Sequence, residues 1–242
     1  MRLALVGLFV SAWLVAESPH TGALPNHRGA RDVGDSTNVR DLPLVEVPAT
    51  IDGHTLAILL SGDGGWASID RQIADELALH GVSVIGFNLK EYLGRERTPD
   101  ETAVAVGRAI RAYRLRWHRD SVVILGFSRG ANIAPFVVNR LANDLRATVT
   151  LIALVSPARA ANFKWHWQDV FRDIKRPSDI PVRPELDRVK AVRVICIFGV
   201  DDTESGCRDT PQEVRRVERR GGHHMDGNYR AVADVVLDAL AP

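Results

Sequence analysis

One serine, Ser128, lies where an apolar run gives way to a helical pattern. The run and its continuation read VVILGFSRGANIAPF over residues 122–136, so Gly126 and Gly130 flank the serine. A strand, a Gly-x-Ser-x-Gly turn and a helix in this order are typical of a nucleophile elbow. The glycines allow the sharp turn that would hold the serine hydroxyl above the strand end. We therefore interpret Ser128 as a nucleophile, and the amide of Arg129 at the helix start as an oxyanion donor.

Strand-like and helical segments alternate from residue 42 onward. Several of the strand-like runs are almost wholly apolar, which is typical of strands covered on both faces in a parallel sheet. The chain has 242 residues, of which 45% are hydrophobic, and this suits one domain with one sizeable core. The sequence thus predicts a three-layer α/β fold with a mostly parallel sheet and helices on both faces.

Two of the predicted helices have recognisable start signals. Ser68 is expected to cap the first helix, which ends near Gly81. Thr98, Pro99 and Glu101 predict a capping box for the second helix, with Thr at the cap and Glu at the third helical position.

Residues 157–184 interrupt the alternation and are called the insertion below. They follow a predicted strand, which places them above the sheet edge where active sites of α/β folds lie. Trp165, Trp167 and Phe171 indicate a short lid-like insertion or a cap that faces lipid. The alternative is a surface insertion whose aromatic side chains fill a small core of their own.

Three acidic residues follow the next-to-last predicted strand, where α/β-hydrolases keep the acid of their catalytic triad. They are Asp201, Asp202 and Glu204, in the stretch FGVDDTESGC. We favour Asp202, three residues after Gly199, with Glu204 as the alternative and Asp201 last. The other interpretation of this stretch is a solvated turn.

A histidine pair follows the last predicted strand, in the stretch RGGHHMDGNY. Serine, acid and histidine in this chain order are typical of α/β-hydrolases. We favour His223 over the alternative, His224, because the preceding glycine pair lets the loop approach the serine closely. The second histidine is then expected to point into the core or the shell around it. A core histidine without a catalytic role is the alternative for either position.

The stretch LLSGDGGW follows an apolar strand and precedes a predicted helix. The amide of Asp63 in this loop is the candidate for the second oxyanion donor. A plain turn is the alternative, and a phosphate-binding loop is not indicated because its Gly-x4-Gly-Lys-Ser/Thr motif is absent. Asp63, Trp66 and Asp226 are also candidate substrate-binding residues. Either acidic residue could receive an ammonium group of the substrate or be structural.

The N-terminus has the order of a secretory signal peptide, with one Arg, a short apolar run, and then small and polar residues. The run is shorter than the roughly 20 residues that span a membrane, so we expect a removed signal at residues 1–23 and a periplasmic protein. Cleavage is expected after Ala23 or Ala16, and an uncleaved anchor is the alternative. Residues 24–41 lack periodicity and are expected to be a flexible tether, and residues 42–242 the domain.

The chain has two cysteines, Cys196 and Cys207. In an exported protein, two cysteines so close in sequence favour a disulfide bond. The alternative is a buried Cys196 on a strand and a free Cys207.

The charges of the chain nearly cancel, with 31 Lys and Arg against 30 Asp and Glu residues. No overall field therefore draws the protein to nucleic acid, and we expect no nucleic-acid partner. We also expect no metal and no cofactor.

With these residues in hand, the sequence resembles the VirJ/AcvB family. Its members are exported bacterial α/β-hydrolases that include lysyl-phosphatidylglycerol hydrolases and proteins linked to virulence. The resemblance covers about Leu56 to the C-terminus and rests on SGDGGW with the following ID, TPDETA, GFSRGANIAPF, CIFG with the later Cys207, and GGHHMDGNY. The family often has Glu where Asp202 stands, so the resemblance leaves the triad acid open.

The resemblance implies an α/β-hydrolase fold and a serine hydrolase that cleaves the aminoacyl ester of lysyl-phosphatidylglycerol or a similar aminoacyl lipid. In that chemistry Ser128 attacks the acyl carbon, His223 takes the proton of Ser128, and Asp202 orients the histidine. The amides of Asp63 and Arg129 hold the oxyanion. The implied partners are an aminoacyl-phospholipid or small ester substrate, a peripheral membrane contact and secretion-system proteins. The alternatives are a scaffold component of a virulence or secretion system, or a general carboxylesterase.

Overall fold

The computed structural model describes residues 37–170 and 174–241. The predicted signal peptide, most of the predicted tether and Phe171 lie outside these residues. The last residues of the predicted tether are described, and they lie against the domain. Val39 packs on the core, and the guanidinium of Arg108 binds the carboxylate of Asp41 and the carbonyl oxygen of Asn38.

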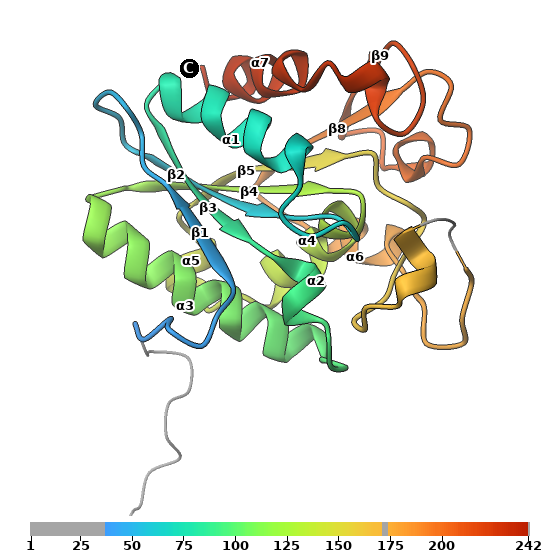
Figure 1. Ribbon diagram of the computed structural model, residues 1–242, viewed down its shortest axis with the longest axis horizontal. Helices are drawn as coiled ribbons and strands as arrows, with labels where there is room; N and C mark the ends of the chain where they lie inside the picture. Colours follow the sequence, from blue (N-terminus) through green and yellow to red (C-terminus); the bar gives the residue numbers. More distant parts are fainter. Residues whose placement is uncertain (1–36, 171–173, 242) are drawn as a thin grey trace, which may run out of the picture. The chain divides into compact units, whose positions relative to one another are not determined.

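Among the described residues, seven strands form the central sheet, in the order β1-β3-β2-β4-β5-β8-β9 (Figure 1). The edge strand β1 is antiparallel to β3, and the other neighbours are parallel. The strands are β1 (Leu44–Val47), β2 (Thr55–Leu60), β3 (Val82–Phe87), β4 (Ser121–Phe127), β5 (Val149–Val155), β8 (Arg193–Gly199) and β9 (Arg215–Arg219). The predicted fold class, an α/β fold with a mostly parallel sheet, is confirmed.

Helices cover both faces of the sheet. The longer helices α1 and α7 lie on one face, and α3 and α4 lie on the other (Figure 1). The helices are α1 (Ser68–Leu79), α2 (Leu89–Tyr92), α3 (Pro99–Trp117), α4 (Arg129–Arg140), α5 (Asn143–Arg146), α6 (Arg183–Arg188) and α7 (Tyr229–Leu240), with 3-10 turns η1 (Trp167–Val170), η2 (Gly206–Asp209) and η3 (Met225–Gly227).

The apolar strands are buried on both faces because their side chains alternate between two cores. On β2, Leu56, Ile58 and Leu60 join the core under α3 and α4. Ala57 and Leu59 join the core under α1 and α7. This explains why the strand sequences are continuous apolar runs and do not alternate between polar and apolar residues.

One predicted helix start is confirmed and the other is wrong. Thr98 and Glu101 form the expected capping box, since the Thr98 hydroxyl accepts from the Glu101 amide at 3.1 Å and the Glu101 carboxylate accepts from the Thr98 amide at 2.7 Å. Ser68 does not cap α1 but is its first residue. The carboxylate of Asp70 reaches back instead and accepts from the Ala67 amide at 2.9 Å.

The insertion is anchored by a two-stranded pair, β6 (Ala160–Ala161) and β7 (Ile180–Pro181), which is antiparallel. Its buried aromatic side chains join the core under α3 and α4 and do not form a small core of their own. Phe163 is buried against Phe136 with ring centroids 5.4 Å apart, and Trp165 is half-buried on the same core. Trp167 is 63% exposed.

The two cysteines form the predicted disulfide, Cys196–Cys207. It joins β8 to η2 and so closes the acid loop, which is the name used below for residues 200–206. Both cysteines are fully buried.

Candidate active site

Ser128 lies in a strained turn between β4 and α4. Its φ of 52° and ψ of −115° are unusual for a residue with a side chain. The flanking glycines are required by contacts, because a Cβ at Gly126 would lie 2.3 Å from the carbonyl carbon of Gly130. A Cβ at Gly130 would lie 1.9 Å from the carbonyl oxygen of Leu60. Only glycine therefore lets the elbow pack so closely against β2.

The structure brings Ser128, His223 and Asp202 together in a row of hydrogen bonds. The Nε2 atom of His223 lies 3.1 Å from the Ser128 hydroxyl oxygen. Its Nδ1 atom lies 3.2 Å from a carboxylate oxygen of Asp202, whose side chain is 10% exposed. The three residues follow the carboxyl ends of β4, β9 and β8, which meet at one edge of a parallel sheet. A serine, an imidazole and an orienting carboxylate at these distances can act as nucleophile, general base and positioning acid.

The two alternatives of the sequence analysis make other hydrogen bonds, although the ring of His224 packs edge-on against that of His223, with ring centroids 5.4 Å apart. The side chain of Glu204 is 88% exposed and pairs with Arg159 at 3.1 Å. The Nδ1 atom of His224 lies 3.3 Å from the Tyr229 hydroxyl.

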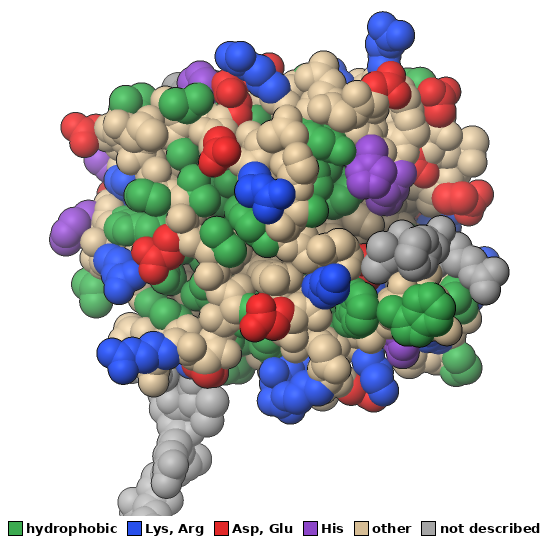
Figure 2. Space-filling view, in the orientation of Figure 1, with side chains coloured by type: hydrophobic (Ala, Val, Ile, Leu, Met, Phe, Trp, Pro, Cys, Tyr) green, Lys and Arg blue, Asp and Glu red, His purple; other side chains and the backbone are tan. Residues whose placement is uncertain are grey.

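The sequence analysis expected the ring of His224 to point into the core or the shell around it. The ring lies at the surface instead, where it packs beside Phe127 with ring centroids 5.4 Å apart. Its partial burial lowers the pKa of His224, and the nearby imidazole of His223 lowers it further. Figure 2 shows histidine side chains at the surface of the face in view, one group of them beside hydrophobic side chains.

Ser156 is a site residue that the sequence analysis missed. It follows β5, is fully buried, and has a φ of 47°. Its hydroxyl donates to the carbonyl oxygen of His223 at 2.8 Å, and its amide donates to the carbonyl oxygen of Ile197 at 2.8 Å. Ser156 thus fixes the backbone of the histidine to the sheet. The available signal was a polar residue directly after an apolar strand.

The Gly-rich loop, residues 61–66, lies against the nucleophile elbow. Gly62 packs so closely that a Cβ there would lie 3.0 Å from the Phe127 ring and 3.4 Å from the Ser128 Cβ atom. The loop turns at Gly65, whose amide donates to the Gly62 carbonyl at 3.1 Å. The loop containing Asp63 is therefore next to Ser128, as an oxyanion donor requires.

The structure gives the three predicted substrate-binding side chains other surroundings. The carboxylate of Asp63 pairs with the guanidinium of Arg129, so it does not face solvent alone to receive an ammonium group. The ring of Trp66 packs on Gly86 of β3, where a Cβ would lie 2.3 Å from it. These two side chains have contacts with the protein that sequence spacing does not reveal.

Asp226 lines a pocket of about 550 Å³ beside the start of α7. Arg219 and Arg220 line the same pocket, whereas the described residues of its wall include neither Ser128 nor His223. The structure therefore does not bring Asp226 together with the serine as a substrate-binding residue.

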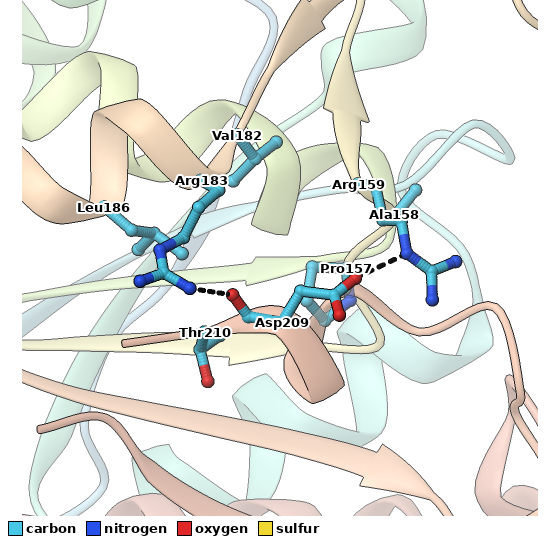
Figure 3. Close-up of a pocket in the computed structure, with 9 residues that line it drawn as sticks. Pro157, Ala158, Arg159, Val182, Arg183, Leu186, Asp209 and Thr210 are labelled. Atoms are coloured by element: carbon cyan, nitrogen blue, oxygen red, sulfur yellow. Dashed lines mark hydrogen bonds and ion pairs between the residues drawn. The ribbon is translucent and has the colours of Figure 1, made fainter. Parts of the chain in front are cut away.

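A smaller pocket, of about 180 Å³, lies between the insertion and the acid loop (Figure 3). Its charged groups are paired at the rim, where Arg159 binds the Asp209 carboxylate at 2.5 Å and Arg183 donates to the Asp209 carbonyl at 2.6 Å. The lining residues are Pro157, Ala158, Arg159, Val182, Arg183, Leu186, Gly206, Asp209 and Thr210. The wall of the pocket is mainly apolar, and its described residues include neither Ser128 nor His223.

Within residues 37–170 and 174–241, no cluster of three or more His, Cys, Asp and Glu side chains is arranged to hold a metal ion. No helix in this part of the chain has the length and apolar character needed to cross a membrane.

Comparison with solved structures shows an α/β-hydrolase fold. An alpha-beta serine hydrolase homologue from Coxiella burnetii matches with a TM-score of 0.58 and 16% identity, over 82% of this chain and 91% of that one. MenH from S. aureus matches with a TM-score of 0.60 and 12% identity, over 81% of this chain and 97% of that one. Est1E from Butyrivibrio proteoclasticus matches with a TM-score of 0.55 and 13% identity, over 82% and 93%.

No curated protein sequence matches the chain. The family model described as bacterial virulence protein (VirJ) matches residues 54–242, a span that contains the Gly-rich loop, the elbow, the acid loop and the histidine pair. The chain belongs to the VirJ family of bacterial virulence proteins, and its fold is that of the α/β-hydrolases.

Proposed function

We propose that the protein is a serine hydrolase that cleaves the aminoacyl ester of lysyl-phosphatidylglycerol or a similar aminoacyl lipid. The observation that carries the catalytic part is the row of hydrogen bonds from Asp202 through His223 to Ser128. The three residues come from three separate loops, and each loop follows a strand of the same sheet.

The reaction follows the chemistry of an acyl-enzyme. Ser128 attacks the acyl carbon while the Nε2 atom of His223 takes the hydroxyl proton. Asp202 accepts a hydrogen bond from Nδ1 and so stabilises the imidazolium, and the amides of Asp63 and Arg129 bind the oxyanion. The imidazolium then gives its proton to the leaving glycerol oxygen. Water then attacks the acyl carbon while His223 takes one of its protons. The imidazolium gives this proton to the Ser128 oxygen as the acyl bond breaks, which yields lysine and free Ser128.

The lipid substrate is supported by the family and by the insertion. Trp167, on the insertion, is 63% exposed, and an exposed Trp suits contact with a lipid interface. We also propose export to the periplasm, since the buried disulfide suits an oxidising compartment. Secretion-system proteins remain proposed partners on family grounds alone.

A general carboxylesterase is the second candidate function. It is favoured by the Asp63 carboxylate, which pairs with the guanidinium of Arg129 and is therefore not set to bind a lysyl ammonium group beside Ser128.

The test uses purified protein with vesicles of phosphatidylglycerol that contain lysyl-phosphatidylglycerol. We expect the wild type to release free lysine. In Ser128→Ala the rate of lysine release should fall by 10²-fold or more, with an unchanged melting temperature. The comparison substrate is p-nitrophenyl acetate. Hydrolysis of this ester without lysine release would support the carboxylesterase, and no Ser128-dependent hydrolysis of either substrate would contradict both functions.

A further inference from the structure

We propose that the side chain of Arg129 is a positioning residue that clamps the Gly-rich loop to the nucleophile elbow and to the insertion. The clamp holds the Asp63 amide where the oxyanion forms, so this inference rests on the proposed function. The backbone amide of Arg129 and its side chain then have separate roles, one as a proposed oxyanion donor and the other as a clamp.

The guanidinium of Arg129 joins three segments of the chain. It is buried, with 6% of the side chain exposed, and its Nε atom donates to the carboxylate of Asp63. Its Nη1 atom donates to the carbonyl oxygen of Asn162 at 2.9 Å and to that of Lys164 at 3.4 Å. A planar guanidinium can serve these acceptors at the same time, which the ammonium of a lysine matches poorly.

The insertion holds Asp63 a second time. The indole nitrogen of Trp165 donates to the Asp63 carbonyl oxygen at 3.0 Å. Trp165 is itself fixed, since its amide donates to the Leu93 carbonyl at 2.8 Å and the Lys90 ammonium lies 5.3 Å from its ring centroid. Asp63 is thus held through its side-chain carboxylate and through its backbone carbonyl oxygen. These two contacts fix the residue whose amide is the proposed oxyanion donor.

The acceptors of Arg129 are also fixed from within the insertion. The Asn162 side chain accepts from the Lys164 amide at 2.9 Å and donates to Ser178 at 2.9 Å and to Asp179 at 2.7 Å. The part of the insertion between β6 and Trp165 therefore acts as a fixed support for the Gly-rich loop. A lid that lifts at this point would break the contacts that hold the Asp63 loop.

Catalysis is more sensitive to such a clamp than folding is. A displacement of about 1 Å at catalytic groups can cost about 10²-fold in rate. Loss of one oxyanion donor costs about 10²–10³-fold in kcat. Because uniform substrate binding does not depend on the oxyanion donor, the loss should fall on kcat and leave KM nearly unchanged.

The chain offers a matched control on the same helix. Arg140 ties α4 to α6, directly after the insertion, through an ion pair with the buried carboxylate of Glu185 at 3.1 Å. It lies 11 positions beyond Arg129, about 16 Å along the helix. Arg140→Met therefore removes a comparable arginine contact far from Ser128.

The experiment measures kcat and KM for p-nitrophenyl acetate, the rate of Ser128 labelling by a fluorophosphonate, and the melting temperature. In Arg129→Met we expect kcat and the labelling rate to fall by at least about tenfold, with KM within about twofold of wild type. In Arg140→Met we expect a lower melting temperature and both rates within about twofold of wild type. Equal rate losses in the two variants would overturn the clamp.

The double variant Asp63→Asn/Arg129→Met separates positioning from stability. It removes both charges, so no buried carboxylate is left unpaired and the melting temperature should rise above that of Arg129→Met. The labelling rate should stay low, because the clamp is still missing. If the labelling rate recovers together with the melting temperature, Arg129 is structural only and the inference is wrong.

The proposed function and the clamp fail in different ways. If the fluorophosphonate does not label wild-type Ser128, the proposed function is overturned, and the positioning role with it. If wild type is labelled and Arg129→Met is labelled equally fast, the positioning role alone is overturned.

Discussion

Two serines with left-handed backbone conformations hold His223. Ser128 contacts the Nε2 atom of the ring, and Ser156 donates to the carbonyl oxygen of the same residue. Their φ angles are 52° and 47°, which cost free energy in residues with a side chain. Both turns end a buried strand, so the sheet maintains the strain. The imidazole is thereby placed by its ring and by its backbone.

The histidine pair gives the first prediction at the residue scale. His223→Ala should lower kcat by 10²-fold or more, because it removes the proposed base next to Ser128. The matched change His224→Ala should leave kcat within about tenfold of wild type. The ring of His224 binds the Tyr229 hydroxyl and packs on Phe127 and His223, whereas the hydrogen bond to Ser128 comes from His223. Steady-state hydrolysis of p-nitrophenyl acetate checks both. An inactive His224→Ala beside an active His223→Ala would reverse the assignment.

The acid loop gives the second prediction. Asp202→Asn should lower kcat by 10²-fold or more, because the amide no longer supplies the negative charge that orients and stabilises the imidazolium. Glu204→Gln is the matched control, with a side chain that is 88% exposed and paired with Arg159. Its kcat should stay near that of wild type. Normal turnover in Asp202→Asn together with an inactive Glu204→Gln would show that Glu204 is the acid that orients His223.

Ser156 gives the third prediction. Ser156→Ala leaves the His223 carbonyl without the hydroxyl that binds it, so kcat should fall by about tenfold while KM changes little. Ser83→Ala is the control, because Ser83 is equally buried and its hydroxyl accepts from Ala49 and Arg119, away from the site. Each variant should lose about 1–3 kcal/mol in free energy of unfolding. Similar kcat values for the two variants would refute a positioning role.

At the scale of elements, local patterns predicted more than isolated residue types did. The Thr98 and Glu101 pair predicted a capping box because both partners are three residues apart in sequence. Ser68 was a single residue, and it failed as a cap because the helix starts one residue earlier than expected, with Ala67 at the cap and its amide bound by the carboxylate of Asp70. The choice between the two depends on how the Gly-rich loop enters α1. That path is set by packing on the sheet and not by the helix sequence.

Asp70 is a buried carboxyl in α1 and gives the fourth prediction, on stability against pH. It is fully buried, one of its oxygens has no hydrogen-bond partner among the described residues, and burial raises its pKa from 3.8 to about 7. The folded protein therefore retains a proton between about pH 4 and 7 that the unfolded chain has released. Stability should fall as pH rises through this window.

Asp70→Asn should remove that dependence, because an amide does not ionise. The free energy of unfolding of the variant relative to wild type should rise by up to about 4 kcal/mol between pH 4 and pH 8. Urea denaturation at several pH values measures this difference. Asp75→Asn, at an exposed position of the same helix, is the control and should show no such rise. An equal stability difference at pH 4 and pH 8 would contradict the raised pKa.

At the scale of the whole molecule, the sequence indicates which loops meet but not what their side chains contact. The strand, helix and motif order indicated that Ser128, Asp202 and His223 follow strands of one parallel sheet. It could not show that the Asp63 carboxylate pairs with Arg129, which is 66 residues away. Nor could it show that Trp66 packs on Gly86 or that Asp226 faces a different pocket. Those contacts depend on the tertiary path of segments with no shared local pattern.

The disulfide links the proposed compartment of the protein to its site and gives the last prediction. Cys196–Cys207 closes the acid loop, in which Asp202 lies 3.2 Å from His223. The loop has other contacts, such as the Gly206 amide donating to the Pro157 carbonyl at 2.6 Å, so it should keep its fold without the bond.

The double change Cys196→Ala/Cys207→Ala should cost about 3 kcal/mol in free energy of unfolding by the loop-entropy estimate. It should also lower kcat by about tenfold at temperatures where the variant is fully folded, because small displacements of Asp202 misplace the imidazole. Circular dichroism and ester hydrolysis measured at the same temperature separate the two effects. A fully folded variant with the kcat of wild type would show that the disulfide stabilises the fold and does not position the acid.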